Sequence, residues 1–185
     1  NYSSPIQVGS MTTWKQVFVD GYTTIGYMTD GTMYSFGKNT EGELGAEVWH
    51  TQTRSSPQQV GSSTNWNQVS VNRHTAAIKT DGTMWVWGLN NKGQLGNGTT
   101  LNYSSPIQIG ALTNWKQVAC GYTRFTAAVK TDGTLWTWGD YTGGQTGNFT
   151  QNEYSSPVQI GALTNWKQVS TGASFTSAIT FRDLG

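Results

Sequence analysis

This chain is poor in charge, in cysteine and in long apolar runs. Charged residues make up 11% of its 185 residues, about half the share of an average soluble protein. Its lysines and arginines are scattered singly, which argues against nucleic acid or an acidic membrane surface as a partner. Cys120 is the only cysteine, so no disulfide can form within the chain. No apolar run approaches the length of a membrane-spanning helix, and we expect no membrane insertion.

The chain is rich in glycine and in aromatic residues. It has 23 glycines and nine tryptophans, and aromatic residues reach 12%. A disordered chain would show few aromatics and a high net charge, whereas the formal net charge here is +1. We therefore expect a packed, β-rich protein. The chain starts at Asn1 without a signal-peptide pattern, and we interpret it as part of something longer.

One nine-residue phrase occurs three times at a fixed spacing. It reads TDGTMYSFG at 29–37, TDGTMWVWG at 80–88 and TDGTLWTWG at 131–139. Each of the four prolines lies in a Ser-Ser-Pro phrase, and a tryptophan follows each proline nine residues later. Such periods indicate a repeat architecture. The approximate repeat units are 1–52, 53–101, 102–152 and an incomplete 153–185.

Each unit reads as four short strands. The Ser-Pro phrase, the Trp-Lys-Gln-Val phrase, the Thr-Ala-Ala-Ile-Lys phrase and the aromatic phrase are each four to six residues long. Asp81-Gly82 predicts a two-residue hairpin with φ > 0 at both residues. That turn pairs small residues with large ones, and both faces of the sheet are apolar. The predicted pairs are Ile78 with Trp85, Ala76 with Trp87, Val129 with Trp136, Ala127 with Trp138, Tyr27 with Tyr34 and Ile25 with Phe36.

These units predict an all-β fold, a β-propeller of four-stranded antiparallel blades. Helical repeats are excluded because no window shows a 3.6-residue apolar period. The chain holds three full blades and partial edge strands, which is too little to close a ring. We expect the remaining blades to come from the same longer chain or from other copies of this one.

Three phrases also resemble a known family. SSPIQIGALTNWKQV (104–118), HTAAIKTDGTMWVWG (74–88) and NNKGQLGNGT (90–99) are similar to the regulator of chromosome condensation repeat. The resemblance implies blades of a seven-bladed propeller. It also implies a histidine before the third strand, which only the second unit keeps, as His74. The namesake of the family suggests an alternative function, a guanine-nucleotide exchange factor for a small GTPase.

No catalytic, cofactor or metal site is predicted. Asp30, Asp81 and Asp132 recur, and turn chemistry explains them better than a repeated metal site. His50 and His74 have no carboxylate or Cys/His partner at metal-ligand spacing. We interpret Cys120 as a small core thiol rather than a nucleophile. The paired aromatic residues of the fourth strand could form a sugar-stacking platform, but their recurrence opposite small residues favours a blade core.

Two loops vary between units in length and chemistry, and repeat proteins place such variation on their binding face. One loop follows the Trp-Lys-Gln-Val strand and the other follows the aromatic strand. Tyrosine, tryptophan and arginine also dominate interface energies. The binding candidates are Tyr22, Arg73, His74, Tyr122 and Arg124 in the first loop set, and Trp49, His50, Tyr141 and Phe149 in the second.

The function predicted from the sequence is a non-enzymatic binding or structural module that presents loops on a rigid propeller. Charge-poor, Thr- and Asn-rich copies of this repeat are typical of virion and bacterial surface proteins, so we expect an extracellular or virion location and a protein or glycan partner. A glycosidase would need two opposed carboxylates. Glu41, Glu43, Glu47 and Glu153 lie in variable loops without matching pairs.

Overall fold

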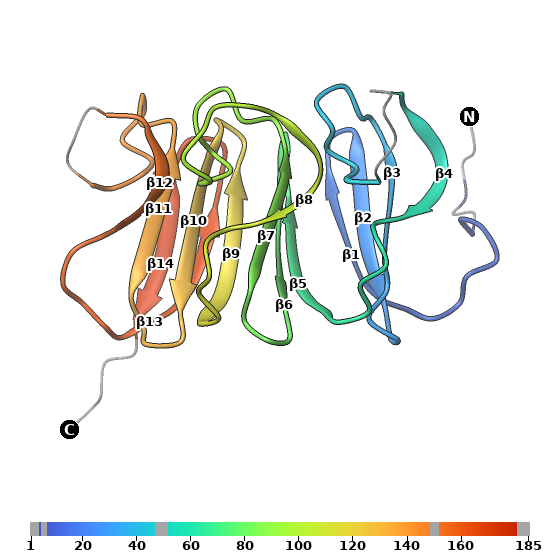
Figure 1. Cartoon of the computed structure of the whole chain (residues 1–185), viewed down its shortest axis with the longest axis horizontal. Coiled ribbons are helices and arrows are strands. Elements are labelled where there is room, and N and C mark those ends of the chain that lie inside the picture. Colours follow the sequence, from blue (N-terminus) through green and yellow to red (C-terminus); the bar gives the residue numbers. More distant parts are fainter. Residues whose placement is uncertain (1–3, 5–6, 47–51, 149–151, 181–185) are drawn as a thin grey trace.

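The computed structural model describes residue 4 and residues 7–46, 52–148 and 152–180. These residues form β-strands and no helix (Figure 1). The first sheet contains β1 (Trp14–Asp20), β2 (Thr23–Met28), β3 (Met33–Gly37) and β4 (Arg54–Gln59). The second contains β5 (Trp66–Val71), β6 (His74–Lys79), β7 (Met84–Gly88) and β8 (Tyr103–Gln108). Over the described residues, no helix is available to span a membrane.

The described residues form two further sheets. The third contains β9 (Trp115–Gly121), β10 (Phe125–Lys130), β11 (Leu135–Gly139) and β12 (Tyr154–Gln159). The fourth contains β13 (Trp166–Thr171) and β14 (Thr176–Thr180). Every strand pairs antiparallel with its neighbour in sequence within each sheet. The prediction of an all-β propeller fold, with three full blades and part of a fourth, is confirmed.

The Ser-Pro strand belongs to the sheet of the unit before it. β4 begins at Arg54 in the second sequence unit, yet it pairs with β3 through Tyr34 and Gln59. β8 and β12 pair with β7 and β11 in the same way. Each sheet is therefore offset by one strand from the sequence repeat, and this overlap joins successive units through backbone hydrogen bonds.

The predicted register of the β6–β7 hairpin is wrong by one residue. Trp85 lies opposite Ala77 rather than Ile78, and Trp87 lies opposite Thr75. The third sheet repeats this register with Trp136 opposite Ala128, and the first has Tyr34 opposite Gly26. Large residues still face small ones, as expected. The predicted partners, however, lie on the other face of each sheet.

The turn itself explains this shift. The Lys79 nitrogen donates to the Thr83 carbonyl (3.0 Å) and the Gly82 nitrogen donates to the Lys79 carbonyl (2.9 Å), so three residues form the loop. Only Gly82 has a positive φ, of 78°. This is a turn closed by a left-handed glycine, a common three-residue hairpin. Asp81 stabilises it, because its Oδ1 accepts hydrogen bonds from the Thr83 nitrogen (2.9 Å) and hydroxyl (2.7 Å).

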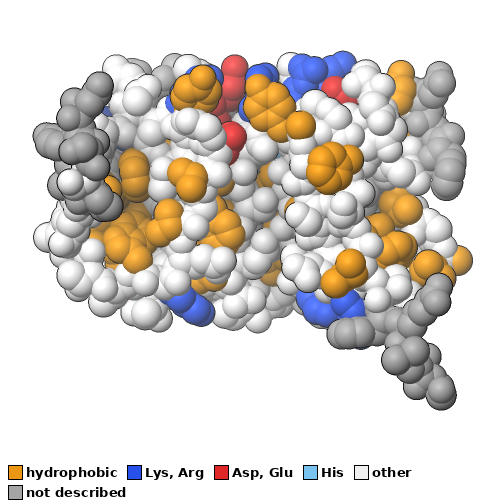
Figure 2. Space-filling view, turned by 180° about the vertical axis from the view of Figure 1, so that it is seen from behind, with side chains coloured by type: hydrophobic (Ala, Val, Ile, Leu, Met, Phe, Trp, Pro, Cys, Tyr) orange, Lys and Arg blue, Asp and Glu red, His pale blue; other side chains and the backbone are white. Residues whose placement is uncertain are grey.

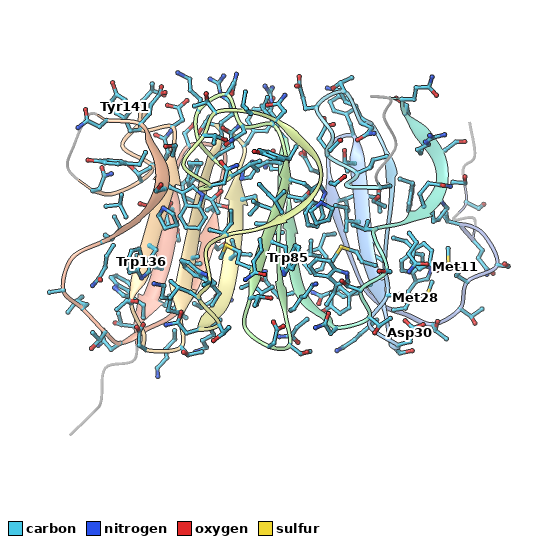
Figure 3. The ribbon with its side chains drawn as sticks, viewed as in Figure 1. Met11, Met28, Asp30, Trp85, Trp136 and Tyr141 are labelled. Atoms are coloured by element: carbon cyan, nitrogen blue, oxygen red, sulfur yellow. The ribbon has the colours of Figure 1, made fainter. Side chains whose placement is uncertain are left out.

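The core lies between the sheets, which stand one behind another along the long axis of the molecule (Figure 1). The first and second sheets enclose a cluster that includes Ile25, Tyr27, Met33 and Trp87. A second cluster lies between the second and third sheets, and a third between the third and fourth. Trp85 and Trp136 occupy equivalent places in successive sheets (Figure 3). Each inner sheet is therefore buried on both faces, as the sequence predicts.

Candidate functional site

The two variable loop sets lie along one edge of the molecule, which we call the loop edge. It consists of the loops that follow β1, β3, β5, β7, β9 and β11 (Figure 1). Backbone hydrogen bonds join the two loops of each sheet, from Lys38 to the Tyr22 carbonyl (2.8 Å) and from Leu89 to the Arg73 carbonyl (3.2 Å). The opposite edge, with the turns at Asp30, Asp81 and Asp132, we call the hairpin edge. Figure 3 shows Asp30 on it.

Three of the predicted binding residues meet on the loop edge. The Arg73 guanidinium lies over the Tyr122 ring, 4.8 Å from its centroid, and its Nη2 donates to the Tyr122 hydroxyl at 3.1 Å. Tyr22 is 77% exposed, and the Lys38 ammonium lies 5.6 Å from its ring centroid. These pairs hold aromatic and cationic groups together at the surface, in the combination that protein interfaces favour.

A small hollow of about 80 Å³ lies between these side chains. Asp20 lines it together with Glu43 and Arg73. Burial raises the pKa of Asp20, the Arg73 charge opposes that shift, and the Glu43 charge adds to it. Glu43 is nearly buried, and its carboxylate accepts a hydrogen bond from the Glu41 nitrogen (2.7 Å). The hollow therefore offers carboxylates at its floor and aromatic rings at its mouth.

The same edge continues over the third sheet. Arg124 has a φ of 64°, which is unusual for a residue with a side chain, and its Nη2 lies 3.5 Å from the buried Asp140 carboxylate. Lys92 forms an ion pair with Glu153. Tyr141 lies at this edge (Figure 3). Figure 2 shows acidic, basic and hydrophobic side chains mixed along the loop edge, whereas the hairpin edge carries basic side chains at separate places.

The structure separates one predicted binding residue, His74, from this surface. His74 lies in β6 with no exposed surface, where its Nε2 is 2.7 Å from the Thr126 hydroxyl oxygen. No surface partner can contact it, so its placement among the exposed loop residues is wrong. The cause is that this position opens the strand in every full sheet, since β2 starts at Thr23, β6 at His74 and β10 at Phe125, each opposite the last glycine of the next strand. Trp49, His50 and Phe149 lie outside the described residues.

The sequence analysis did not predict that Asp20, Lys38, Lys92 and Asp140 lie on the loop edge. It named Glu43 but did not predict that this residue lines the hollow. A signal was available, because charge is scarce in this chain and Asp20, Lys38 and Asp140 lie at or next to strand ends. β1 and β3 also run in the same direction, so the loops that follow them must end at the same edge.

The structure offers no arrangement for acid–base or nucleophilic catalysis at Cys120. This thiol is buried between the second and third sheets, its Sγ lies 3.3 Å from the Ser70 carbonyl, and burial raises its pKa to about 12. The interpretation as a core residue is confirmed. Within the described ranges, no three His, Cys, Asp or Glu side chains gather closely enough to hold a metal ion.

The stacked four-stranded sheets and their shared loop edge define a repeat protein of the β-propeller class. Comparison with known families identifies the repeat. The regulator of chromosome condensation (RCC1) repeat matches three times in tandem, at residues 30–78, 81–129 and 132–179, and a second RCC1 repeat description matches residues 115–145. The chain belongs to the RCC1 repeat family. Each tandem match begins at or next to the aspartate of a hairpin-edge turn.

Proteins with this repeat include much longer chains. The ultraviolet-B receptor UVR8 of Arabidopsis thaliana is 32% identical over 176 residues, which are 91% of this chain and 39% of the receptor. An RCC2 homologue of Danio rerio is 39% identical over 90 residues, 47% of this chain and 18% of that protein. The chain thus spans about two fifths or less of the length of these relatives.

Solved structures share the fold at low sequence identity. Prp20p of Saccharomyces cerevisiae superimposes with a TM-score of 0.80 at 16% identity, over 94% of this chain and 45% of that one. Human WBSCR16 has a TM-score of 0.79 at 20% identity, over 92% of this chain and 45% of that one. In both cases the likeness concerns the fold alone.

Proposed function

We propose that this chain is part of a non-enzymatic module that binds a protein partner through its loop edge. The observation that carries the proposal is the surface formed by Tyr22, Arg73 and Tyr122 around the acid-lined hollow. Exposed tyrosines and a preorganised arginine contribute strongly to protein interfaces because little rotamer entropy is lost when they are covered. The carboxylates of Asp20 and Glu43 favour a partner that presents a basic or hydrogen-bond-donating side chain to the hollow.

Two proteins of the same fold support a protein partner. Prp20p was crystallised in a study of its binding to Gsp1p and histones, and yeast RCC1 (Prp20) was also crystallised with Kap60 bound to it. These are properties of Prp20. For the present chain they support protein as the class of ligand to test first, ahead of a glycan. An extracellular or virion location remains a prediction from composition.

Binding measurements with matched variants test this proposal. The probes are purified Gsp1p, purified histones and a glycan array, and the protein is the full 185-residue chain. We expect binding to at least one of the proteins, weakened at least about tenfold by Tyr22→Ala or Tyr122→Ala. The control is Leu112→Ala, a 47% exposed leucine on the hairpin edge, which should leave affinity unchanged.

The outcomes separate the alternatives. Binding to glycans with no binding to either protein would contradict a protein partner. Protein binding that Leu112→Ala abolishes and the tyrosine variants spare would place the contact on the wrong edge. Accelerated nucleotide release from a small GTPase would replace the proposal with the exchange-factor alternative.

A further inference from the structure

Two acidic residues line the hollow on the loop edge, and the second sheet carries a neutral amide in place of each. Asp20 pairs with Thr23, the first residue of β2. In the second sheet, the Asn72 nitrogen donates to the carbonyl of His74, the first residue of β6 (2.8 Å). Asp20 and Asn72 therefore occupy equivalent positions, and their side chains have nearly the same shape but differ in charge.

Glu43 and Gln94 are equivalent in the same way. The carbonyl of each residue accepts a hydrogen bond from a tryptophan indole of the following sheet, at 2.8 Å in both cases. Within its own loop, the Glu43 carboxylate accepts from the Glu41 nitrogen (2.7 Å). The Gln94 amide oxygen accepts from the Lys92 nitrogen (2.8 Å). The loop therefore requires an acceptor oxygen at this position but no charge.

The two charges are costly to the fold. Glu43 is 4% exposed and Asp20 is partly buried, and burial disfavours the ionised form of a carboxyl group. Burial raises the pKa of Asp20, the Arg73 charge opposes this rise, and the Glu43 charge adds to it. The Asp20 carboxylate forms no hydrogen bond or ion pair with another residue that the structure describes. Neutral amides would avoid these costs, so the fold itself does not require the charges.

The two cationic side chains of the hollow are held by aromatic rings. Arg73 lies over the Tyr122 ring and donates to its hydroxyl (3.1 Å). Lys38 lies over the Tyr22 ring. In the part of the chain that the structure describes, neither cation forms an ion pair with either carboxylate of the hollow. Those carboxylates can therefore still accept hydrogen bonds from a ligand.

The size of the hollow limits the ligand to a single functional group. Its volume of about 80 Å³ has room for a few water molecules, whereas a pocket for a whole small molecule holds about 300–1,000 Å³. A guanidinium or ammonium group fits this space and donates to carboxylates in strong, charge-assisted hydrogen bonds. Its apolar stem can lie against the Tyr22 and Tyr122 rings. Figure 2 shows acidic side chains between hydrophobic ones on this edge.

We propose that the hollow receives the cationic end of an arginine or lysine side chain that the protein partner extends into it. This inference rests on the loop-edge function proposed above and names the group that the partner presents. Asp20 and Glu43 then determine specificity, while Tyr22 and Tyr122 supply contact area. The second sheet has amides at both acidic positions, so the preference for a cation is confined to the junction of the first and second sheets.

Nuclear magnetic resonance titration of the full 185-residue chain tests the proposal. The probes are the N-acetyl amides of arginine, lysine and citrulline, and citrulline has the shape of arginine without its charge. We expect saturable millimolar binding of the arginine or lysine derivative, observed at the Gly21, Tyr22 and Arg73 amides, and no saturable binding of the citrulline derivative. The Asp20→Asn/Glu43→Gln variant should weaken this binding at least about tenfold. Its circular dichroism should be unchanged, because both substitutions copy the amides of the second sheet.

Glu153→Gln is the matched control, because it removes a carboxylate that lies outside the hollow and pairs with Lys92. This variant should bind the cationic probes as the wild-type chain does. The proposal is overturned if neither cationic derivative binds, if the citrulline derivative binds equally well, or if the double variant binds as tightly as the wild type.

The double variant also separates this inference from the proposed function. If Tyr22→Ala weakens binding of Gsp1p or histones and Asp20→Asn/Glu43→Gln does not, the loop edge binds protein but the hollow receives no cation. If the cationic probes bind in the hollow and neither protein binds, the inference stands, and the choice of these two proteins is wrong.

Discussion

Burial determines the chemistry of the single residues that most resemble catalytic groups. The Thr126 hydroxyl donates to the Gln94 carbonyl (2.7 Å), so its oxygen accepts from His74 and fixes the proton on Nε2. Nδ1 is buried with no hydrogen-bond partner among the described residues. Burial lowers the pKa of His74 to about 3. A neutral imidazole buried between two sheets is a structural group. Because it cannot take up a proton in the folded chain, it destabilises the fold as the pH falls.

Stability should therefore fall in mild acid through His74. In the unfolded chain histidine titrates near its ordinary value of 6.5, whereas folded His74 stays neutral down to about pH 3. Protons then bind preferentially to the unfolded chain below pH 6.5. We expect the free energy of unfolding to drop by about 1.4 kcal/mol per pH unit, or roughly 2 kcal/mol between pH 6.5 and 5. Urea denaturation at stepped pH measures this slope.

The His74→Phe variant is the control, because the third sheet carries buried Phe125 at this position. The variant loses the Thr126 contact and is expected to be less stable at pH 7, but its stability should be nearly flat between pH 7 and 5. An equal slope in both proteins would show that other groups cause the pH dependence.

Position 82 has two requirements that only glycine can meet. Its φ is 78°, and a Cβ there would lie 2.0 Å from the Thr113 carbonyl oxygen of the next sheet. Gly82→Ala should therefore cost more than about 3 kcal/mol of unfolding free energy. Gly61→Ala is the matched control, with a φ of 58° and open space around the new methyl, and should cost only about 1 kcal/mol. Thermal denaturation compares them, and equal losses would contradict the close contact.

At the scale of elements, the sequence was sufficient for the strands but not for their register. Tandem phrases and turn residues locate β6 and β7 correctly, because apolar runs between Asp-Gly turns have few alternatives. Asp81-Gly82 fits both two- and three-residue hairpins, however, and the two differ by one residue in register. In the three-residue turn, Gly82 lies against the backbone of the next sheet. The sequence of a single hairpin does not show this contact, so it could not decide between the two turns.

Gln68 and Gln117 are predicted to stabilise the junctions that they cross. Gln68→Ala leaves the backbone groups of buried Val118 without their side-chain partner, which should cost about 1–3 kcal/mol. Gln58 is exposed, and its side-chain nitrogen donates to the adjacent Pro57 carbonyl (3.2 Å), so Gln58→Ala should cost less than about 0.5 kcal/mol. Chemical denaturation measures the stability of the two variants. Similar denaturation midpoints would contradict the prediction and indicate that water replaces the Gln68 amide.

For the whole molecule, the sequence predicted the stacking of sheets but not the composition of its surfaces. Apolar residues on both strand faces required neighbours, and the three inter-sheet clusters supply them. The contact between Arg73 and Tyr122 joins two loops about fifty residues apart in the sequence, and their distance in space is set by the packing of β5 and β6 against β9. His74 is buried against Thr126 of the third sheet, whereas Tyr22 of the first sheet is exposed.

Hydrogen exchange tests most directly whether each sheet is stabilised by its neighbours. The protein for this measurement is the full 185-residue chain. The account predicts that amides of β6, β7 and β10 exchange most slowly, near the rate of global unfolding, while those of β1, β13 and β14 exchange faster. Equal protection in all four sheets, or faster exchange in β6 than in β14, would contradict it.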